Sequence, residues 1–369
     1  MLYLCYSIND FAIMEAGISL LSFLMNNPGY EPEEVFFVDY GIHPRNKERL
    51  GEIASRYGKR ITFLDGKSVT DQVKREFPHL GAWRYTMAPN AKPFMDKIVP
   101  DYVERLLFVD ADTLVTGSVR ELQSLDMGGA ALAAVPQGYD TASIRSGGLT
   151  LCHGSDMYFN SGVLLYDLAV WRREDCHQMV RETLKMKRQF YSPDQTLLNN
   201  AMPARLLCRL PLKYNHLTHH MHPRQEPKYL ASFGVYTKEE ISEAIQHPVI
   251  THFTGGDHQA RPWHEGCWSY RKDEYLRYKA LSPWKDTPLL YDYRKKHPRK
   301  GFFGKGTMFV LWLMAKQPSY RLTAFVSRSL GRLSALRARV INLPPGMEEG
   351  VEVKSEKLWS NRNYMSVIR

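Results

Sequence analysis

The chain has 369 residues, of which 44% are hydrophobic and 24% charged, a composition typical of a globular protein with one large domain and an appendage. Its formal net charge of +10 is unevenly placed, because residues 293–340 hold twelve Lys and Arg with no Asp or Glu, whereas residues 1–292 carry a net charge of −2. A near-neutral body with one basic segment argues against a general nucleic-acid-binding protein.

Apolar runs alternate with helix-like segments over the first 110 residues. Strands are predicted at residues 2–7, 35–39, 60–64 and 106–110, and helices at 13–25 and 46–57. This alternation is typical of a doubly wound α/β sheet. Later strands are predicted at 130–135, 162–166 and 249–252, and later helices at 169–186 and 194–200. Residues 211–230, which are rich in His, Pro and Tyr, predict an irregular segment.

Two changes in composition divide the chain, one near Pro283 and one at Pro344-Pro345-Gly346. They predict a large domain at 1–283, a basic helical appendage at 284–345 and a tail at 346–369. Within the appendage, residues 321–340 have helical periodicity, with an apolar stripe and an arginine stripe. Such a helix either packs on the core with a solvated arginine face or lies on an anionic membrane surface, and the absence of acids favours the membrane. A third alternative is packing against another subunit of a homo-oligomer.

Cysteine use and hydropathy predict a cytoplasmic location. The five cysteines, at 5, 152, 176, 208 and 267, are odd in number and show no C-x-x-C spacing, which favours reduced thiols. The first residues become polar by Ser7, as expected for a strand rather than a signal peptide. The longest apolar run, 308–315, is too short to cross a bilayer, which takes about 20 residues. Together with the basic appendage, this predicts peripheral attachment to the inner face of the plasma membrane.

The predicted strand at 106–110 ends in Asp110-Ala111-Asp112. Consecutive apolar residues are typical of a strand buried on both faces, and ligands of open α/β sheets bind at the carboxyl ends of strands. Two carboxylates there can bind one hard divalent cation, although a solvated turn is the alternative. A further alternative is the D-x-D-x-T pattern of haloacid-dehalogenase-like phosphatases, with Asp110 as nucleophile. Those enzymes need a later acidic pair, and no adjacent Asp-Asp follows.

Four segments in this order resemble glycosyltransferase family 8. They are Asp110-Ala111-Asp112, residues 158–165 (YFNSGVLL), residues 193–199 (PDQTLLN), and His252-Phe253-Thr254-Gly255 with Arg261-Pro262-Trp263. The resemblance covers about residues 1–270. It implies a GT-A fold for residues 1–283, with a doubly wound mixed sheet whose first half binds a nucleotide sugar, in a retaining, metal-dependent transferase. Bacterial lipopolysaccharide galactosyl- and glucosyltransferases and the glycogenins are members of this family.

The resemblance also assigns roles to single residues. Asp110, Asp112 and His252 would hold Mn²⁺. Mg²⁺ is the alternative ion, but imidazole is a better ligand for Mn²⁺ than for Mg²⁺. Donor and acceptor sugars would be bound by Asn160, Ser161, Asp194 and Gln195, the last two being the catalytic pair. Asp194 would bind sugar hydroxyls, and Gln195 would stabilise charge at the anomeric carbon. The nucleotide would be bound by Ser7, Ile8, Asn9, Asp10, Phe11, Lys92, Asp110, Ala111, Asp112, Gly255 and Arg261.

The chain departs from the family pattern at several positions, among them Ile8, which stands where related bacterial enzymes often carry an acid. Residues 256–260 lengthen the last motif by three residues, and Arg261 stands where lysine is usual, although arginine also binds phosphate. Lys92 is the nearest base to a position that usually holds arginine, and Gln137 replaces an acid. Purely structural roles remain alternatives: a helix N-cap for Asp194, a turn at 160–162, a strand-end polar residue for His252 and a solvated lysine for Lys92.

The sequence therefore predicts an enzyme that transfers glucose or galactose from a UDP-sugar and forms an α-linkage. The expected acceptor is a glycan, a lipid-linked sugar or a glycoprotein. The alternative to an enzyme is a catalytically inactive, membrane-associated nucleotide-sugar-binding protein on the same fold.

Overall fold

The computed structural model describes residues 1–82, 86–137, 158–186, 193–218, 226–231, 234–254, 261–267 and 269–290. All of them belong to the first of two compact units, Met1–Lys296, and the second unit, His297–Arg369, lies outside the described residues. The helix predicted at 321–340 and the tail at 346–369 also lie outside them. These two assignments, and the appendage boundary at 284, therefore stay predictions.

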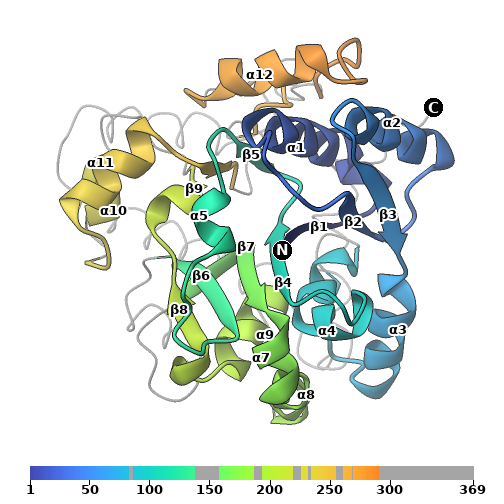
Figure 1. Cartoon of the computed structure of the whole chain (residues 1–369), viewed down its shortest axis with the longest axis vertical. Helices are drawn as coiled ribbons and strands as arrows, with labels where there is room; N and C mark the ends of the chain where they lie inside the picture. Colours follow the sequence, from blue (N-terminus) through green and yellow to red (C-terminus); the bar gives the residue numbers. More distant parts are fainter. Residues whose placement is uncertain are drawn as a thin grey trace, which may run out of the picture. The chain divides into compact units, whose positions relative to one another are not determined.

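A seven-stranded mixed sheet forms the centre of the first unit (Figure 1). Its strand order is β3-β2-β1-β4-β7-β6-β8. The strands are β1 (Leu2–Ile8), β2 (Glu34–Asp39), β3 (Arg60–Leu64), β4 (Arg105–Val109), β6 (Leu132–Pro136), β7 (Phe159–Asp167) and β8 (Leu207–Arg209). The first four are parallel, whereas β7 runs antiparallel to both β4 and β6. The predicted doubly wound mixed sheet is thereby confirmed.

Helices cover both faces of this sheet (Figure 1). On one side of the sheet, a single hydrophobic cluster includes residues of α1 (Ile13–Asn26), α2 (Pro44–Ser55), α11 (Lys238–Gln246) and α12 (Lys272–Leu281), with α12 packed against α1. The other face packs against α3 (Gly66–Glu76), α4 (Met95–Ile98), α7 (Leu168–Arg173), α8 (Cys176–Met186) and α9 (Pro193–Ala201). The sequence of β4 is uniformly apolar because this strand is covered on both faces. Leu107 packs in the first cluster and Phe108 in the second, and both are fully buried.

The order of the strands reverses between β1 and β4. The chain runs from β1 outward through β2 and β3, and then returns to place β4 on the other side of β1. The carboxyl ends of β1 and β4 therefore lie side by side and the two following loops diverge, which is the usual ligand-binding place of an open α/β sheet. The turn that follows β4 contains Asp110 and Asp112, so both acids lie at this place.

A small second sheet, β5-β10-β9, brings the end of the domain back to this place. It contains β5 (Thr113–Val115), β9 (His216–Leu217) and β10 (Ile250–His252). Strand β10 pairs antiparallel with β5, so that His252 lies opposite Thr113 and next to Asp112. Parallel pairing of β10 with β9 brings residues 215–218 to the same region.

The structure corrects two sequence predictions. The single helix predicted at 169–186 is two helices, because Asp175 adopts a left-handed conformation with a φ of 50° between α7 and α8. Asp tolerates this conformation better than most residues, and the N–H of Asp175 donates to the carbonyl of Arg172 there. The described part of 211–230 is not wholly irregular, since it holds the 3-10 helix η5 (Leu212–Tyr214), β9 and the start of α10 (Glu226–Ala231).

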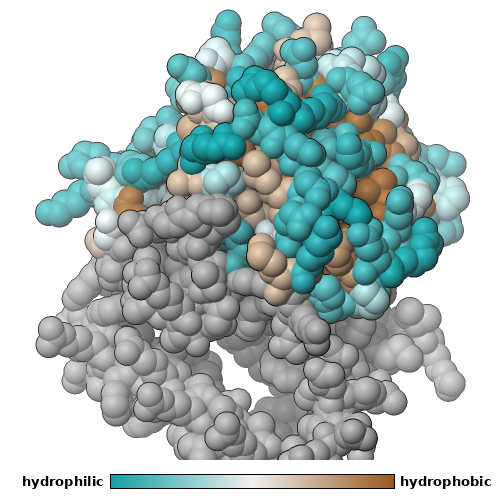
Figure 2. Space-filling view, turned by 90° about the horizontal axis from the view of Figure 1, so that it is seen from below, coloured by the Kyte–Doolittle hydropathy of each residue, from teal (hydrophilic) through white to brown (hydrophobic). Residues whose placement is uncertain are grey.

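Polar side chains dominate the described part of the surface shown in Figure 2, where hydrophobic residues form small, separate patches. Among the described residues, no helix combines the length and the hydropathy needed to cross a bilayer.

Candidate active site

Asp110 and Asp112 lie in the turn that follows β4. The N–H of Asp110 donates to the carbonyl of Gly162 on β7, and the N–H of Phe253 donates to the carbonyl of Asp112, both at 2.8 Å. These bonds fix the turn between two strands. They also bring His252, the last residue of β10, to the acidic pair, with Nε2 3.1 Å from Oδ1 of Asp112.

These three side chains fit a divalent cation. One ligand atom from each of Asp110, Asp112 and His252 lies within 4.8 Å of the other two. Ligand atoms about 2.2 Å from a metal are up to about 4.4 Å apart, so small side-chain movements would close the set around one ion. Two carboxylates and an imidazole are a donor set that suits Mn²⁺.

Charges around the acidic pair hold Asp112 ionised. Burial raises the pKa of Asp110, with the ammonium of Lys92 acting in the opposite direction. Burial also acts to raise the pKa of Asp112, but His252 and then Arg261 outweigh it and hold that pKa well below its usual range. Nη1 of Arg261 lies 3.1 Å from Oδ2 of Asp112. Asp112 is thus in the state that metal binding requires at neutral pH.

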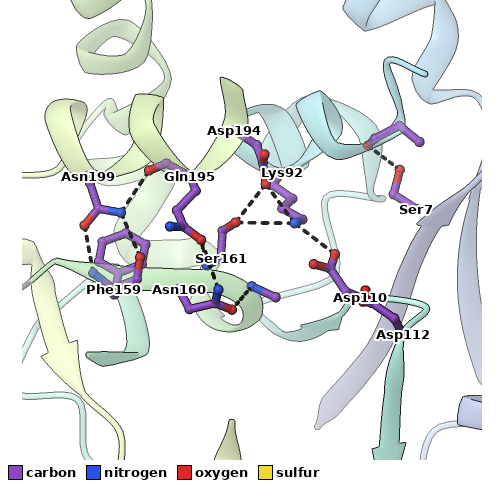
Figure 3. Close-up of polar contacts among 12 residues, drawn as sticks. Ser7, Lys92, Asp110, Asp112, Phe159, Asn160, Ser161, Asp194, Gln195 and Asn199 are labelled. Carbon is purple, nitrogen blue, oxygen red and sulfur yellow. Dashed lines mark hydrogen bonds and ion pairs between the residues drawn. The ribbon is translucent and has the colours of Figure 1, made fainter. Parts of the chain in front are cut away.

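Lys92 connects the acidic pair to α9. Its side chain comes from the 3-10 helix η2 (Ala88–Phe94), is 2% exposed, and places Nζ 2.9 Å from Oδ1 of Asp110 and 2.8 Å from Oδ2 of Asp194 (Figure 3). Burial acts to lower the pKa of Lys92, but the two carboxylates outweigh it and raise that pKa above its ordinary value. The interpretation of Lys92 as a solvated lysine is therefore wrong.

Asp194 lies in the first turn of α9 and faces β7. Its Oδ2 accepts hydrogen bonds from Nζ of Lys92 and Oγ of Ser161, both at 2.8 Å. The helix begins at Pro193, so Asp194 lies inside α9 and its carboxylate binds side chains of the site instead of capping the helix. Ser161 and Asn160 belong to β7, so the turn interpretation of 160–162 is also wrong.

Gln195 uses both ends of its amide. Its Oε1 accepts from the N–H of Ser161 and from Nδ2 of Asn160, both at 3.1 Å. Its Nε2 donates to Oε1 of Gln137 at 2.8 Å and to the hydroxyl of Tyr158 at 3.0 Å. Gln137, which replaces an acid of the family pattern, thus contacts the predicted catalytic residue. The network fixes the amide of Gln195 in one orientation.

Asn215 is a member of the site that sequence reasoning missed. It is fully buried, its Nδ2 donates to Oδ1 of Asn160 at 2.9 Å, and its Oδ1 lies 3.0 Å from Nδ1 of His252. The segment around it has no periodic pattern, because η5 and β9 are only three and two residues long. A lone asparagine in a segment predicted to be irregular gives no sequence signal.

The turn after β1 lies at the neighbouring strand end. Oγ of Ser7 donates to the carbonyl of Ala88 at 2.7 Å (Figure 3), and Oδ1 of Asp10 accepts from two donors near the start of α2, each at 2.9 Å. Ile8 is buried, whereas Phe11 is 76% exposed. The side chains of Ser7 and Asp10 thus order this turn. Gly255, predicted to bind the nucleotide, lies outside the described residues.

Comparison with known sequences gives one family for most of this chain. The model of glycosyl transferase family 8 matches residues 3–267. General stress protein A of Bacillus subtilis is 25% identical over 275 residues, which cover 73% of this chain and 89% of that protein. The lipopolysaccharide 1,2-glucosyltransferase of Escherichia coli K12 is 25% identical over 292 residues, which cover 77% of this chain and 79% of that protein.

A further relative and a solved structure agree with this match. The lipopolysaccharide 1,3-galactosyltransferase of Salmonella typhimurium is 23% identical over 308 residues, covering 78% of this chain and 80% of that protein. The crystal structure of galactosyltransferase LgtC with donor and acceptor sugar analogues superposes with a TM-score of 0.62 at 21% identity, covering 77% of this chain and 96% of that chain. The structural likeness confirms the predicted GT-A fold.

Proposed function

Because the chain belongs to glycosyltransferase family 8, we propose that it transfers glucose or galactose from a UDP-sugar to a glycan or glycoconjugate with retention of configuration, forming an α-linkage. One observation carries this proposal. The metal-type triad Asp110, Asp112 and His252 lies at the strand switch point, and Lys92 joins it to Asp194 on α9.

The charges of the site support a diphosphate donor. Three carboxylates, Asp110, Asp112 and Asp194, surround two cationic side chains, Lys92 and Arg261. Asp110, Asp112 and His252 would hold Mn²⁺, whose chemistry there is to neutralise the leaving diphosphate. Arg261 already lies beside Asp112, and its planar guanidinium can bind a phosphate bidentately.

Residues of β7 and α9 would hold the sugar. Within the described residues, all hydrogen bonds of the Asp194 side chain go through Oδ2, so that Oδ1 remains for a sugar hydroxyl. Ser161 and Asn160 lie beside it on β7. Hydrogen bonds to Gln195, Asp194 and Asn215 fix their side chains, and a rigid set of donors and acceptors lowers the entropic cost of orienting the donor.

Gln195 would face the anomeric carbon with its amide. An amide is a poor nucleophile, and Oε1 of Gln195 already accepts two hydrogen bonds. We therefore infer front-side substitution, in which the amide dipole stabilises positive charge on the sugar and an oxygen of the leaving phosphate accepts the proton of the acceptor hydroxyl. Attack on the face that the diphosphate leaves retains the α-configuration.

UDP release tests this proposal directly. The protein is incubated with UDP-glucose or UDP-galactose, each with Mn²⁺, Mg²⁺ or EDTA and without acceptor. Release from one donor that EDTA abolishes supports the transferase and identifies the sugar. If neither donor is hydrolysed, UDP binding is measured next, and binding without turnover even after acceptors are added favours the binding-protein alternative. Metal-dependent hydrolysis of aryl phosphates without UDP would favour the phosphatase alternative, which the family match already disfavours.

We further propose that the basic segment 293–340 attaches the enzyme to an anionic membrane surface on the cytoplasmic side of the plasma membrane. Twelve Lys and Arg without any Asp or Glu support this, since each base near an anionic leaflet contributes about 1 kcal/mol. The acceptor would then be lipid-linked. Replacing Arg321, Arg328, Arg332 and Arg339 by Gln in the full chain should reduce flotation with anionic vesicles, and unchanged flotation would exclude this role for the helix.

A further inference from the structure

His252 has one ring nitrogen directed at the acidic pair and the other at an amide. Nε2 lies 3.1 Å from Oδ1 of Asp112, and Nδ1 lies 3.0 Å from Oδ1 of Asn215. Only an unprotonated ring nitrogen can bind a metal, so the position of the single proton in the neutral ring decides whether Nε2 is a ligand.

A backbone amide fixes the direction of every hydrogen bond in this chain of side chains. The N–H of Gly162 can only donate, and it lies 2.9 Å from one amide atom of Asn160, which must therefore be the oxygen. Asn215 lies 2.9 Å from the same oxygen and must present its NH₂ group there. Its own oxygen consequently faces Nδ1 of His252, which then carries the proton.

We propose that Asn215 is a positioning residue that holds the neutral ring of His252 in the Nδ1–H tautomer and so keeps Nε2 open as the third metal ligand. This inference rests on the metal site of the proposed function. Asn215 is fully buried, so water does not compete for Nδ1. Being a neutral amide, it orients the ring without adding a further negative charge beside two carboxylates.

The opposite side of the ring needs a cation. With a proton on Nδ1, a bare Nε2 and Oδ1 of Asp112 are two acceptor atoms 3.1 Å apart, which repel each other unless a cation lies between them. In the metal-free protein a second proton on Nε2 fills this place, and this is the form in which His252 lowers the pKa of Asp112. A metal ion replaces that proton, while Asn215 keeps the other proton on Nδ1. Gly162 leaves room for this ring, because a Cβ at that position would overlap it.

The same amide links the metal ligand to the predicted sugar-binding residues. Oδ1 of Asn160 accepts a hydrogen bond from Asn215, and Nδ2 of Asn160 donates one to Oε1 of Gln195. A second backbone donor, the N–H of Ser161, fixes that oxygen of Gln195. A change at Asn215 therefore has two separable consequences, one for His252 and one for Asn160.

Two variants separate these consequences. Asn215→Leu removes both hydrogen bonds. Asn215→Asp keeps an oxygen that accepts from Nδ1 of His252 but removes the donor to Asn160. Asn27→Ala is the matched control, because Asn27 is also buried and hydrogen-bonded but follows the distant end of α1.

The tautomer is measured first, in metal-free protein without any nucleotide sugar and at a pH at which the ring of His252 is neutral. Long-range ¹H–¹⁵N correlation spectra of ¹⁵N-histidine-labelled protein distinguish the two neutral tautomers, and the His252 signals are those missing from His252→Gln. We expect Nδ1–H in the wild type, in Asn215→Asp and in Asn27→Ala, and Nε2–H in Asn215→Leu. A wild-type ring that carries its neutral proton on Nε2 overturns the proposal, even if Asn215→Leu fails to fold.

Metal affinity is measured next, by the loss of the free Mn²⁺ signal in electron paramagnetic resonance. We expect the dissociation constant to rise roughly 10- to 100-fold in Asn215→Leu and to stay unchanged in Asn27→Ala. Asn215→Asp should keep Mn²⁺ affinity and raise KM for the donor through the lost bond to Asn160. Equal Mn²⁺ affinity of wild type and Asn215→Leu contradicts the proposal. Failure of UDP-sugar turnover with the tautomer as expected would contradict only the proposed function.

Discussion

Lys92 and Asp194 form a buried ion pair between residues 102 positions apart in the chain. Nζ lies 2.8 Å from Oδ2, and the two side chains are 2% and 8% exposed. Because the same ammonium also pairs with Asp110, one lysine neutralises charge on both sides of the site and holds η2 against α9.

Removing this ammonium should destabilise the fold. Lys92→Met leaves Asp194 buried without its cation, and breaking a buried pair in this way costs about 3–5 kcal/mol. The expected loss of unfolding free energy lies near the lower value, because Asp110, the second partner of Lys92, is partly exposed and keeps some hydration. Urea denaturation measures it. The double variant Lys92→Met/Asp194→Asn should recover part of the loss, because it removes the uncompensated charge, whereas equal stability of the two variants would show that the pair does not act as a unit.

Asp112 is expected to be required for turnover but not for folding. Asp112→Asn keeps the size of the side chain but removes the anion that His252 and Arg261 approach. UDP release should be lost and Mn²⁺ binding weakened, while the protein still folds with a lower thermal midpoint, because the ionised carboxylate is stabilised by His252 and Arg261. Asp101→Asn, at an exposed position, serves as the control. Turnover that survives in Asp112→Asn would exclude Asp112 as a metal ligand.

Gly162 should tolerate no side chain. A Cβ there would overlap the ring of His252, so Gly162→Ala is expected to cost about 1–3 kcal/mol and to weaken Mn²⁺ binding together with stability. Gly51→Ala is the matched control, since nothing lies within 4 Å of its Cβ position in α2, and alanine there should add up to about 1 kcal/mol. A Gly162→Ala protein with wild-type Mn²⁺ affinity would contradict the close packing of this ring.

Glu15 should make stability fall as the pH rises from about 4.5 to about 7. Burial raises the pKa of Glu15 from 4.5 to about 7, so within this window the folded protein keeps a proton that the unfolded chain has released. Above pH 7 the full cost of the buried carboxylate is present, up to about 3 kcal/mol. Glu15→Gln should therefore be more stable than the wild type at pH 8 and equally stable at pH 4.

Denaturant midpoints in EDTA at pH 4, 6 and 8 measure this dependence. Glu48→Gln, at an exposed position on α2, is the control and should change the pH dependence of stability little. The same stability difference between Glu15→Gln and wild type at all three values would show that Glu15 does not titrate on folding.

The local pattern of the sequence determined most of the sheet and the place of the acidic pair. The strand at 60–64 was predicted with its observed bounds, and the strand before Asp110 differs by one residue at each end. This succeeded because a strand buried on both faces is uniformly apolar, a property that each residue carries by itself. The order of Asp110, Asn160, Gln195 and His252 likewise pointed to the family that the comparison confirms.

Only the tertiary structure decided which side chains meet. Periodicity reports burial along one element, whereas the partners of Lys92 and Asn215 come from strands and helices far away in the chain. The break at Asp175 was missed for the same reason, because the apolar pattern continues on both sides of the bend. Hydrogen-bond direction is likewise a property of assembled neighbours, and here a backbone N–H of β7 orients Asn160, Asn215 and His252 in turn.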